Sequence, residues 1–156
     1  MRRKDREIIG REPILALLER CQVLRLGLCD ADRPYVVPML FAAKADREPL
    51  YIYMHSAAEG RKMDIISKNN RVCFEADHAY RTVNGQTPCE WSGVYQSVMG
   101  EGTIHIVTDE AEKTEALNAL MGRYGFEGTP RYDPDAFRTV TVLRVTVDSL
   151  TGKSTG

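Results

Sequence analysis

The stretch that decides the fold is residues 55–68, which read His-Ser-Ala-Ala-Glu-Gly-Arg-Lys-Met-Asp-Ile-Ile-Ser-Lys. It follows residues 50–54, a β-branched and aromatic run that is typical of a strand. The small residues and Gly60 predict a turn, and the apolar residues after them predict a short helix. A strand that ends in a turn and opens a helix leaves backbone N–H groups unpaired, and such groups attract anions.

Arg61 and Lys62 add two full positive charges at the expected start of this helix. Arginine offers a planar fork of donors and lysine a point charge, so the pair suits a phosphate monoester. The pattern therefore predicts a site for a phosphorylated cofactor. The alternative is a connector whose charges are merely solvated, because strand–turn–helix units with a basic pair are common.

The composition is that of an ordinary globular protein. The 156 residues are 43% hydrophobic and 28% charged, with a net charge of −1, and they predict a single domain over residues 1–156. A near-neutral charge gives no electrostatic footprint for nucleic acid or an anionic membrane. No apolar run approaches the roughly 20 residues of a transmembrane helix, and the basic start lacks the apolar segment of a signal peptide. We therefore expect a cytoplasmic protein with no nucleic-acid or membrane partner.

The four cysteines, Cys21, Cys29, Cys73 and Cys89, are widely spaced and form no Cys-x-x-Cys pair. In a chain without an export signal, such cysteines are usually reduced and buried. The alternative is a zinc site assembled from distant ligands. We expect buried thiols and no metal.

Six segments carry the alternation or the β-branched and aromatic content of strands. They are residues 23–29, 35–43, 50–54, 72–77, 95–107 and 139–147. This pattern predicts a mainly β protein with an antiparallel barrel or closed sheet. The helical crossover between the third and fourth segments is long enough to leave a parallel pair open as well.

Helical periodicity marks residues 5–20, where Pro13 is expected to split the helix, and residues 108–124. Residues 78–94 and 132–138 have no regular pattern and are expected to be irregular. The small, polar tail 151–156 is expected to fray.

Two features of the strands favour contact with a ligand. Pro38 donates no ladder hydrogen bond, so it is expected at a bulge or an edge, where backbone groups are open to a flat polar ring. Gly100 and Gly102 predict a bulge or a close approach of another backbone or of a ligand. The only tryptophan, Trp91, lies in the irregular segment; such a residue usually packs over a core edge and less often covers a ligand or a subunit contact.

Several segments together resemble one known family. They are residues 1–8, 35–39 (Tyr-Val-Val-Pro-Met), 53–62, 69–75 and 95–102 (Tyr-Gln-Ser-Val-Met-Gly-Glu-Gly), of which the His-Ser-Ala-x-x-Gly-Arg-Lys run is the most specific. In these segments the chain resembles the FMN-binding split-barrel superfamily, which includes pyridoxamine 5′-phosphate oxidase. Within that superfamily it is most similar to nitroimidazole-resistance (Nim) type proteins.

The resemblance implies a six-stranded antiparallel split β-barrel with flanking helices, and a homodimer with FMN at the subunit interface. It implies that Arg61 and Lys62 bind the FMN phosphate with Ser56 nearby. The strand at Val37, Pro38 and Met39 is implied to lie along the isoalloxazine ring, and Ser97 to approach the cofactor, with the partner subunit as one source. The C-terminal segment with which pyridoxamine phosphate oxidases grip their substrate is not recognisable in this sequence.

The function implied is that of an FMN-dependent oxidoreductase. It would pass electrons from NAD(P)H to a small acceptor such as a nitroimidazole or another nitroaromatic. His55, beside the phosphate turn, has a reference pKa suited to a general acid near neutral pH, and its alternative role is to hydrogen-bond the turn. The alternative function is a non-catalytic flavin or phosphorylated-ligand binding protein, a carrier or a sensor. His78 and His105 are expected to be structural or surface residues.

Overall fold

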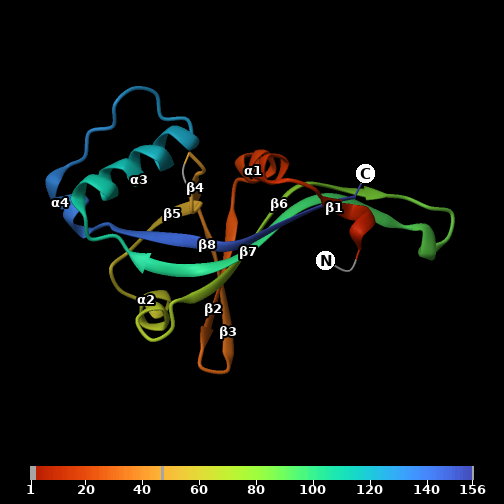
Figure 1. Ribbon diagram of the computed structural model, residues 1–156, viewed down its shortest axis with the longest axis horizontal. Helices are drawn as coiled ribbons and strands as arrows, with labels where there is room; N and C mark the ends of the chain where they lie inside the picture. The colour runs from red at the N-terminus through yellow and green to blue at the C-terminus, as the bar shows by residue number, and fades with distance from the viewer. Residues whose placement is uncertain (1–2, 47, 156) are drawn as a thin grey trace.

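A computed structural model describes residues 3–46 and 48–155, and in this part of the chain eight strands form one antiparallel sheet. The strands are β1 (Glu7–Ile8), β2 (Leu24–Asp30), β3 (Arg33–Met39), β4 (Phe41–Lys44), β5 (Tyr51–Ser56), β6 (Arg71–Val83), β7 (Ser92–Ile106) and β8 (Thr141–Thr155). Their order is β3-β2-β6-β7-β8-β5-β4, and β1 pairs with β8 (Figure 1). The sheet is mainly β and of the split-barrel type, as expected, but the expected number of six strands was wrong.

The two additional strands have local causes. Residues 35–43 form β3 and β4 rather than one strand, because the chain leaves β2 at Leu40 and pairs next with β5. Residues 7–8 pair with β8 instead of belonging to a helix. Gly10 has φ +95°, a conformation that favours glycine, and it separates β1 from α1 (Arg11–Arg20). Pro13 therefore lies in the first turn of α1 and does not split it.

β6 and β8 are longer than the sequence predicted, because both pair with β7 along its length. The irregular segment 78–94 is in part the ends of β6 and β7, joined past a register shift between His78 and Arg81. The tail does not fray in the described part, because β8 continues to Thr155, which pairs with Tyr95. Ladder bonds and tertiary contacts override the polar local composition here. β5 and β6 are not neighbours, so the parallel pair does not form.

The helices are shorter elements on this sheet. They are η1 (Lys4–Arg6), α1, α2 (Arg61–Ile66), η2 (Pro88–Glu90), α3 (Glu110–Arg123) and α4 (Pro134–Thr139). α3 confirms the helix expected at residues 108–124. α4 corrects the loop expected at 132–138: the Asp133 carboxylate caps it by accepting from the N–H groups of Asp135 and Ala136 at 3.0 Å.

Two apolar cores hold the sheet in shape. The first fills the barrel between α1, α2 and the inner face of the strands, with Leu17, Leu26, Phe41, Ile52 and Phe74 among its most buried side chains. The second lies between α3 and the opposite face of β4, β5 and β8. β5 thus has a core on each side, and successive side chains along it point to different cores.

The glycines of β7 behave as expected. A Cβ at Gly100 would lie 2.3 Å from the Phe74 ring, and one at Gly102 would lie 2.3 Å from the Thr146 carbonyl oxygen. The ladder also shifts register between Glu101 and Gly102. Glycine is needed here because strands and core cross too closely for a side chain.

The cysteines depart in part from expectation. Cys21 is buried, and burial raises the pKa of its thiol to about 11, but Cys73 and Cys89 are exposed. Within the described residues no group of three or more metal-ligating side chains forms, and no helix there is long and apolar enough to span a membrane. Met1 and Arg2 of the N-terminal matching segment, and Gly156 of the tail, lie outside the described residues.

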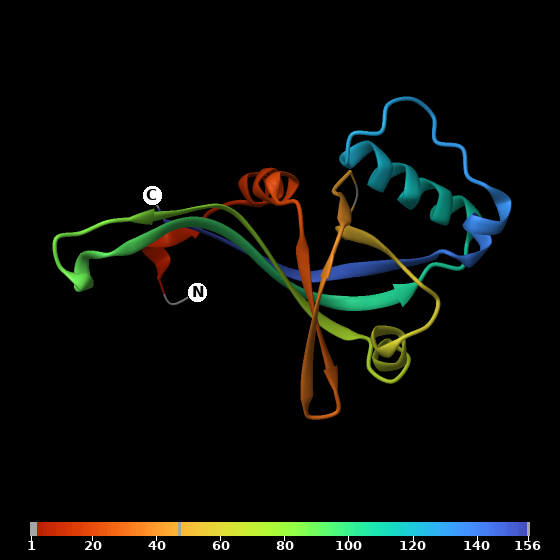
Figure 2. The same ribbon diagram turned by 180° about the vertical axis from the view of Figure 1, so that it is seen from behind.

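The molecule has a body and an arm. The body contains both cores, while the ends of β6 and β7 run out from it as a long projection that closes at η2 (Figures 1 and 2). The β2–β3 hairpin and α2 lie near each other in both views, away from this projection.

Candidate functional site

The corner between β5 and α2 has the conformation that the sequence predicted. β5 ends at Ser56, and α2 begins after Gly60, whose φ is +118°. No atom lies within 4 Å of where a Cβ at Gly60 would be, so the left-handed backbone, and not crowding, explains the glycine. The Gly60 carbonyl accepts from the N–H groups of Met63 at 2.8 Å and Asp64 at 3.1 Å, which starts the helix.

The two cations of this corner reach across to β3. The Arg61 guanidinium lies over the Tyr35 ring, 4.8 Å from its centroid. The Lys62 ammonium lies 3.8 Å from the Met39 sulfur. α2 and β3 are therefore side by side although 22 residues separate Met39 from Arg61 in the chain. Tyr35 was not among the predicted site residues; its place two and four residues before Val37 and Met39, on one face of β3, was the available signal.

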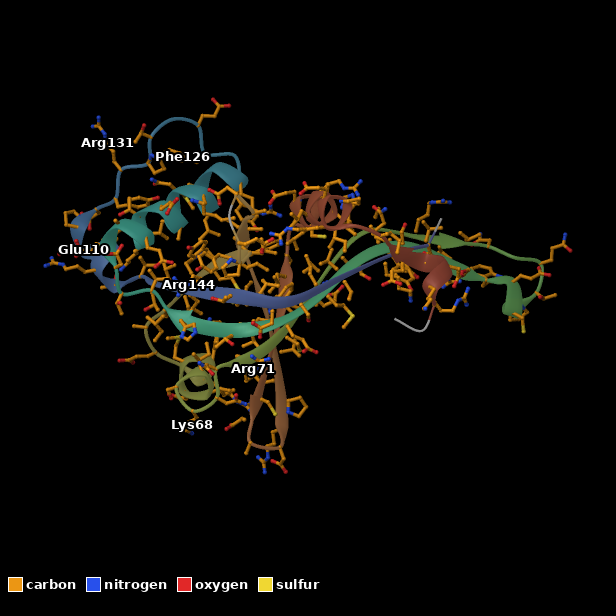
Figure 3. The ribbon with its side chains drawn as sticks, in the orientation of Figure 1. Lys68, Arg71, Glu110, Phe126, Arg131 and Arg144 are labelled. Atoms are coloured by element: carbon orange, nitrogen blue, oxygen red, sulfur yellow. The ribbon has the colours of Figure 1, made fainter. Side chains whose placement is uncertain are left out.

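Neither Arg61 nor Lys62 has a carboxylate within ion-pair distance among the residues that the structure describes. Arg71, near α2 in Figure 3, contrasts with them, because it is paired with Asp148 at 2.7 Å. Partial burial lowers the pKa of Lys62, since the charged form loses water without gaining a counter-charge. An anion at this corner would supply that counter-charge.

The edge strand β3 forms the second part of the site. It ends the sheet order, with β2 as its paired neighbour, which confirms the edge position expected for Pro38. Val37 and Met39 share the face of Tyr35 toward the barrel core, whereas Pro38 is exposed on the opposite face. A planar ligand at this edge would meet the backbone of residues 37–39, and not all three side chains.

A family model described as pyridoxamine 5′-phosphate oxidase matches residues 10–154. The chain belongs to this family. A candidate 5-nitroimidazole antibiotic resistance protein from Bacteroides thetaiotaomicron VPI-5482 is 31% identical, with a TM-score of 0.81 over 94% of this chain and 85% of that one. No curated protein sequence matches at a significant level.

Solved structures of lower identity share the fold. The flavocytochrome Anf3 from Azotobacter vinelandii has a TM-score of 0.84 and 18% identity, over 100% of this chain and 72% of that one. An FAD- and heme-binding protein from Mycobacterium smegmatis has a TM-score of 0.83 and 18% identity, over 97% of this chain and 74% of that one. These two likenesses show a shared fold.

Ser56 and His55 occupy opposite faces of β5. Ser56 is buried on the face of Met54, and its hydroxyl donates to the Ala57 carbonyl at 2.9 Å. His55 is exposed on the other face, opposite Val142 of the second core. The imidazole is therefore not brought to the side of β5 on which Ser56 and α2 pack, and its catalytic role stays a prediction.

Ser97 lies apart from the corner within one protomer. It is on β7 between Asp77 of β6 and Lys153 of β8, where β8 also pairs with β1. β1 and α2 lie near opposite ends of the long strands β6 and β7 in both views (Figures 1 and 2). A role for Ser97 at the cofactor therefore requires a second protomer.

The residues of the corner fit a phosphorylated flavin. The fit rests on a partly buried ammonium that contacts a thioether, beside a guanidinium that has no ion pair within the described residues. α2 has only six residues, so its dipole adds little, and the side-chain charges would be what attracts a phosphate. Arg61 and Lys62 would hold the phosphate, and β3 would border the ring system.

Proposed function

We propose that this member of the pyridoxamine 5′-phosphate oxidase family is an FMN-dependent oxidoreductase that uses NAD(P)H to reduce a small acceptor such as a nitroimidazole or another nitroaromatic. The observation that carries the cofactor assignment is the unpaired Arg61–Lys62 corner beside the edge of β3. The similarity to a candidate 5-nitroimidazole resistance protein supports the acceptor class.

Each residue of the corner has a distinct task in this proposal. Arg61 and Lys62 bind the phosphate oxygens, and the Tyr35 ring holds the guanidinium in position from below. Ser56 closes the β5 end of the corner, and residues 37–39 offer backbone groups to the ring edge. FMN, when bound, supplies the hydride and electron chemistry; the chain supplies its position and charge environment.

A homodimer completes the proposed site. In one protomer, the Arg61–Lys62 corner would contact the phosphate and β3 would contact one side of the ring system. Ser97 would reach the cofactor only from the partner protomer. NAD(P)H and the acceptor would then enter between the protomers.

The direct test is the visible spectrum of the purified protein and its titration with FMN. A flavin spectrum that is lost in the Arg61→Ala/Lys62→Ala variant supports the cofactor assignment. Absence of FMN binding by the wild-type protein, with no protection against melting by phosphorylated ligands, contradicts it.

The alternative function, a flavin carrier or sensor, is favoured by one observation. His55, the proposed general acid, lies on the face of β5 away from Ser56. NADH consumption with added nitroimidazole, quinone and flavin acceptors separates the two functions, because binding without turnover indicates a carrier. If turnover occurs, a His55→Ala variant that keeps the wild-type pH profile contradicts an acid role for this residue.

A further inference from the structure

The projection formed by residues 79–94, here called the arm, extends past the last residue pair between β7 and β8. β8 accompanies β7 only as far as the pair Tyr95–Thr155, and beyond it the ladder consists of β6 and β7 alone, with the pairs Arg81–Val94, Thr82–Gly93 and Val83–Ser92. η2 at its end has no buried residue. A two-stranded hairpin is marginal in water by itself, so an arm of this length requires a surface to lie on.

The arm carries the largest exposed aromatic side chains of the described protein. Tyr80 is 70% exposed and Trp91 is 55% exposed. The Tyr80 ring lies over Gly93, 3.1 Å from where a Cβ would be. Trp91 lies between η2 and β7, and its backbone is extended, with φ −65° and ψ 134°. Because it is two residues before Gly93, this extended backbone places its indole on the same side as Tyr80. The arm therefore has one aromatic face, and the tryptophan does not pack over a core edge.

The protomer has more accessible surface than a monomer of its size. Its area is 9601 Å², whereas a folded monomer of 17.6 kDa is expected to have about 7,900 Å². The surplus of about 1,700 Å² per protomer lies in the range that each subunit of an obligate homodimer buries. A second copy of this chain is thus the occupant that accounts for both the surplus area and the arm.

The edge of β3 is a suitable landing place for the aromatic face. Val36 is 61% exposed and Leu40 is 45% exposed, and both flank the exposed Pro38. Pro34 and Pro38 lack N–H groups, which opposes the addition of another strand at this edge and leaves side-chain contact as the mode of docking. The opposite face of β3 holds Tyr35 under Arg61 and Met39 beside Lys62.

We propose that the arm of each protomer crosses to the β3 edge of its partner, where Trp91 forms an aromatic wall of the partner's flavin site. The flavin in this proposal rests on the proposed function. The second copy of the chain as partner rests on the exposed arm and on the surplus of accessible surface area. In a symmetric dimer the same contact occurs twice, so each site combines Arg61 and Lys62 of one chain with Trp91 of the other. Aromatic contact with the planar ring system supplies affinity that the corner alone lacks.

Complementation between chains tests this arrangement. Two variants, Arg61→Ala/Lys62→Ala and Trp91→Ala, are produced with different tags and purified as the mixed dimer. In that dimer one site lacks both features and the other has both. The expected result is one FMN bound per mixed dimer with wild-type affinity, although the Trp91→Ala homodimer binds about tenfold more weakly and the double variant binds at least about 100-fold more weakly. A mixed dimer with no site of wild-type affinity would overturn the proposal.

Controls separate a local effect from misfolding and from failure of the proposed function. Phe126→Ala removes an exposed aromatic on the loop after α3 (Figure 3) and is expected to bind FMN normally. Trp91→Leu keeps an apolar side chain and is expected to melt like the wild type while binding FMN as weakly as Trp91→Ala. If the wild type binds no FMN, the proposed function fails, but the arm is still testable through its single tryptophan. Blue-shifted emission in the dimer that moves to the red on dilution supports the crossing; a monomer by sedimentation, or red emission at all concentrations, overturns it.

Discussion

The α2 corner and the arm are two exposed regions of the same protein that differ in how far one chain completes them. At the corner, Arg61 and Lys62 lie on partners that their own chain supplies, the Tyr35 ring and the Met39 sulfur. On the arm, Tyr80 and Trp91 face solvent, and the strands beneath them have no third neighbour. On the proposals made above, the charges of the corner await an anion, and the apolar side chains of the arm await a protein surface. The comparison teaches that charged side chains without a counter-charge indicate an ionic ligand, whereas exposed apolar side chains indicate a protein partner.

The largest expected effect is at the corner. Arg61→Ala/Lys62→Ala should weaken FMN binding at least about 100-fold, because each charge-assisted hydrogen bond lost costs about 1.5–3 kcal/mol. Neither cation has an ion pair in the described protein, so melting without ligand should change little. Lys68→Ala removes an exposed cation two residues after the end of α2 (Figure 3) and serves as the control. Equal losses of affinity in both variants would show that only overall charge matters.

The next effect concerns the arm. Replacing the arm and Tyr95 (residues 79–95) by Asn-Gly joins His78 to Gln96, which already face each other, through a turn suited to a two-residue hairpin. The dimer dissociation constant should rise at least about 30-fold, since buried aromatic anchors typically contribute 2 kcal/mol or more. Because the arm belongs to neither core, the free energy of unfolding of the monomer should change little.

Sedimentation at several concentrations and urea unfolding of the dilute protein measure the two quantities separately. A shortened chain with the same dimer dissociation constant as the wild type would contradict the claim that the arm, unlike the corner, needs a second chain. A shortened chain that fails to fold would show that the arm is needed to stabilise its own protomer.

A smaller effect is expected at Tyr35. Tyr35→Ala should weaken FMN binding about twofold to fivefold, because a cation–π contact at an exposed site contributes about 0.5–1 kcal/mol. Tyr35→Phe keeps the ring face and should bind like the wild type. Calorimetric titration of both variants measures this, and a loss as large in Phe as in Ala would assign the effect to the hydroxyl instead.

The smallest effect is a dependence on pH. Burial lowers the pKa of Lys62 in the free protein, and a bound phosphate favours the ammonium form and raises that pKa again. Binding above the free-protein pKa therefore takes up a proton, so affinity should be level from pH 7 and then fall as pH rises through it. Lys62→Arg keeps its charge and should remove most of the decline. A decline that is unchanged in this variant would assign it to another group.

Local chemistry explains what the sequence could predict. Gly60 after β5, the apolar spacing of Met63, Ile65 and Ile66, and the basic pair are all within one short segment, and α2 formed there as expected. The edge position of Pro38 and the close packing at Gly100 and Gly102 also follow from single residues. Such features depend on backbone geometry that the residue itself imposes.

Features that depend on distant pairing could not be predicted. The polar tail up to Thr155 is ordered because β7 lies beside it, and residues 7–8 form a strand because β8 does. The cation–π contact of Tyr35 depends on how α2 docks on the β2–β3 hairpin. His55 and Ser56 were placed in one site because they are adjacent in sequence, but adjacent residues of a strand face opposite sides.

The central claim is that Arg61 and Lys62 bind the phosphate of a flavin, and the most direct measurement compares FMN with riboflavin, which lacks the phosphate. The account predicts that the wild type binds FMN at least about 100-fold more tightly than riboflavin, and that this preference disappears in Arg61→Ala/Lys62→Ala. Equal affinity of the wild type for the two flavins, or a preference for FMN that survives in the double variant, would contradict it.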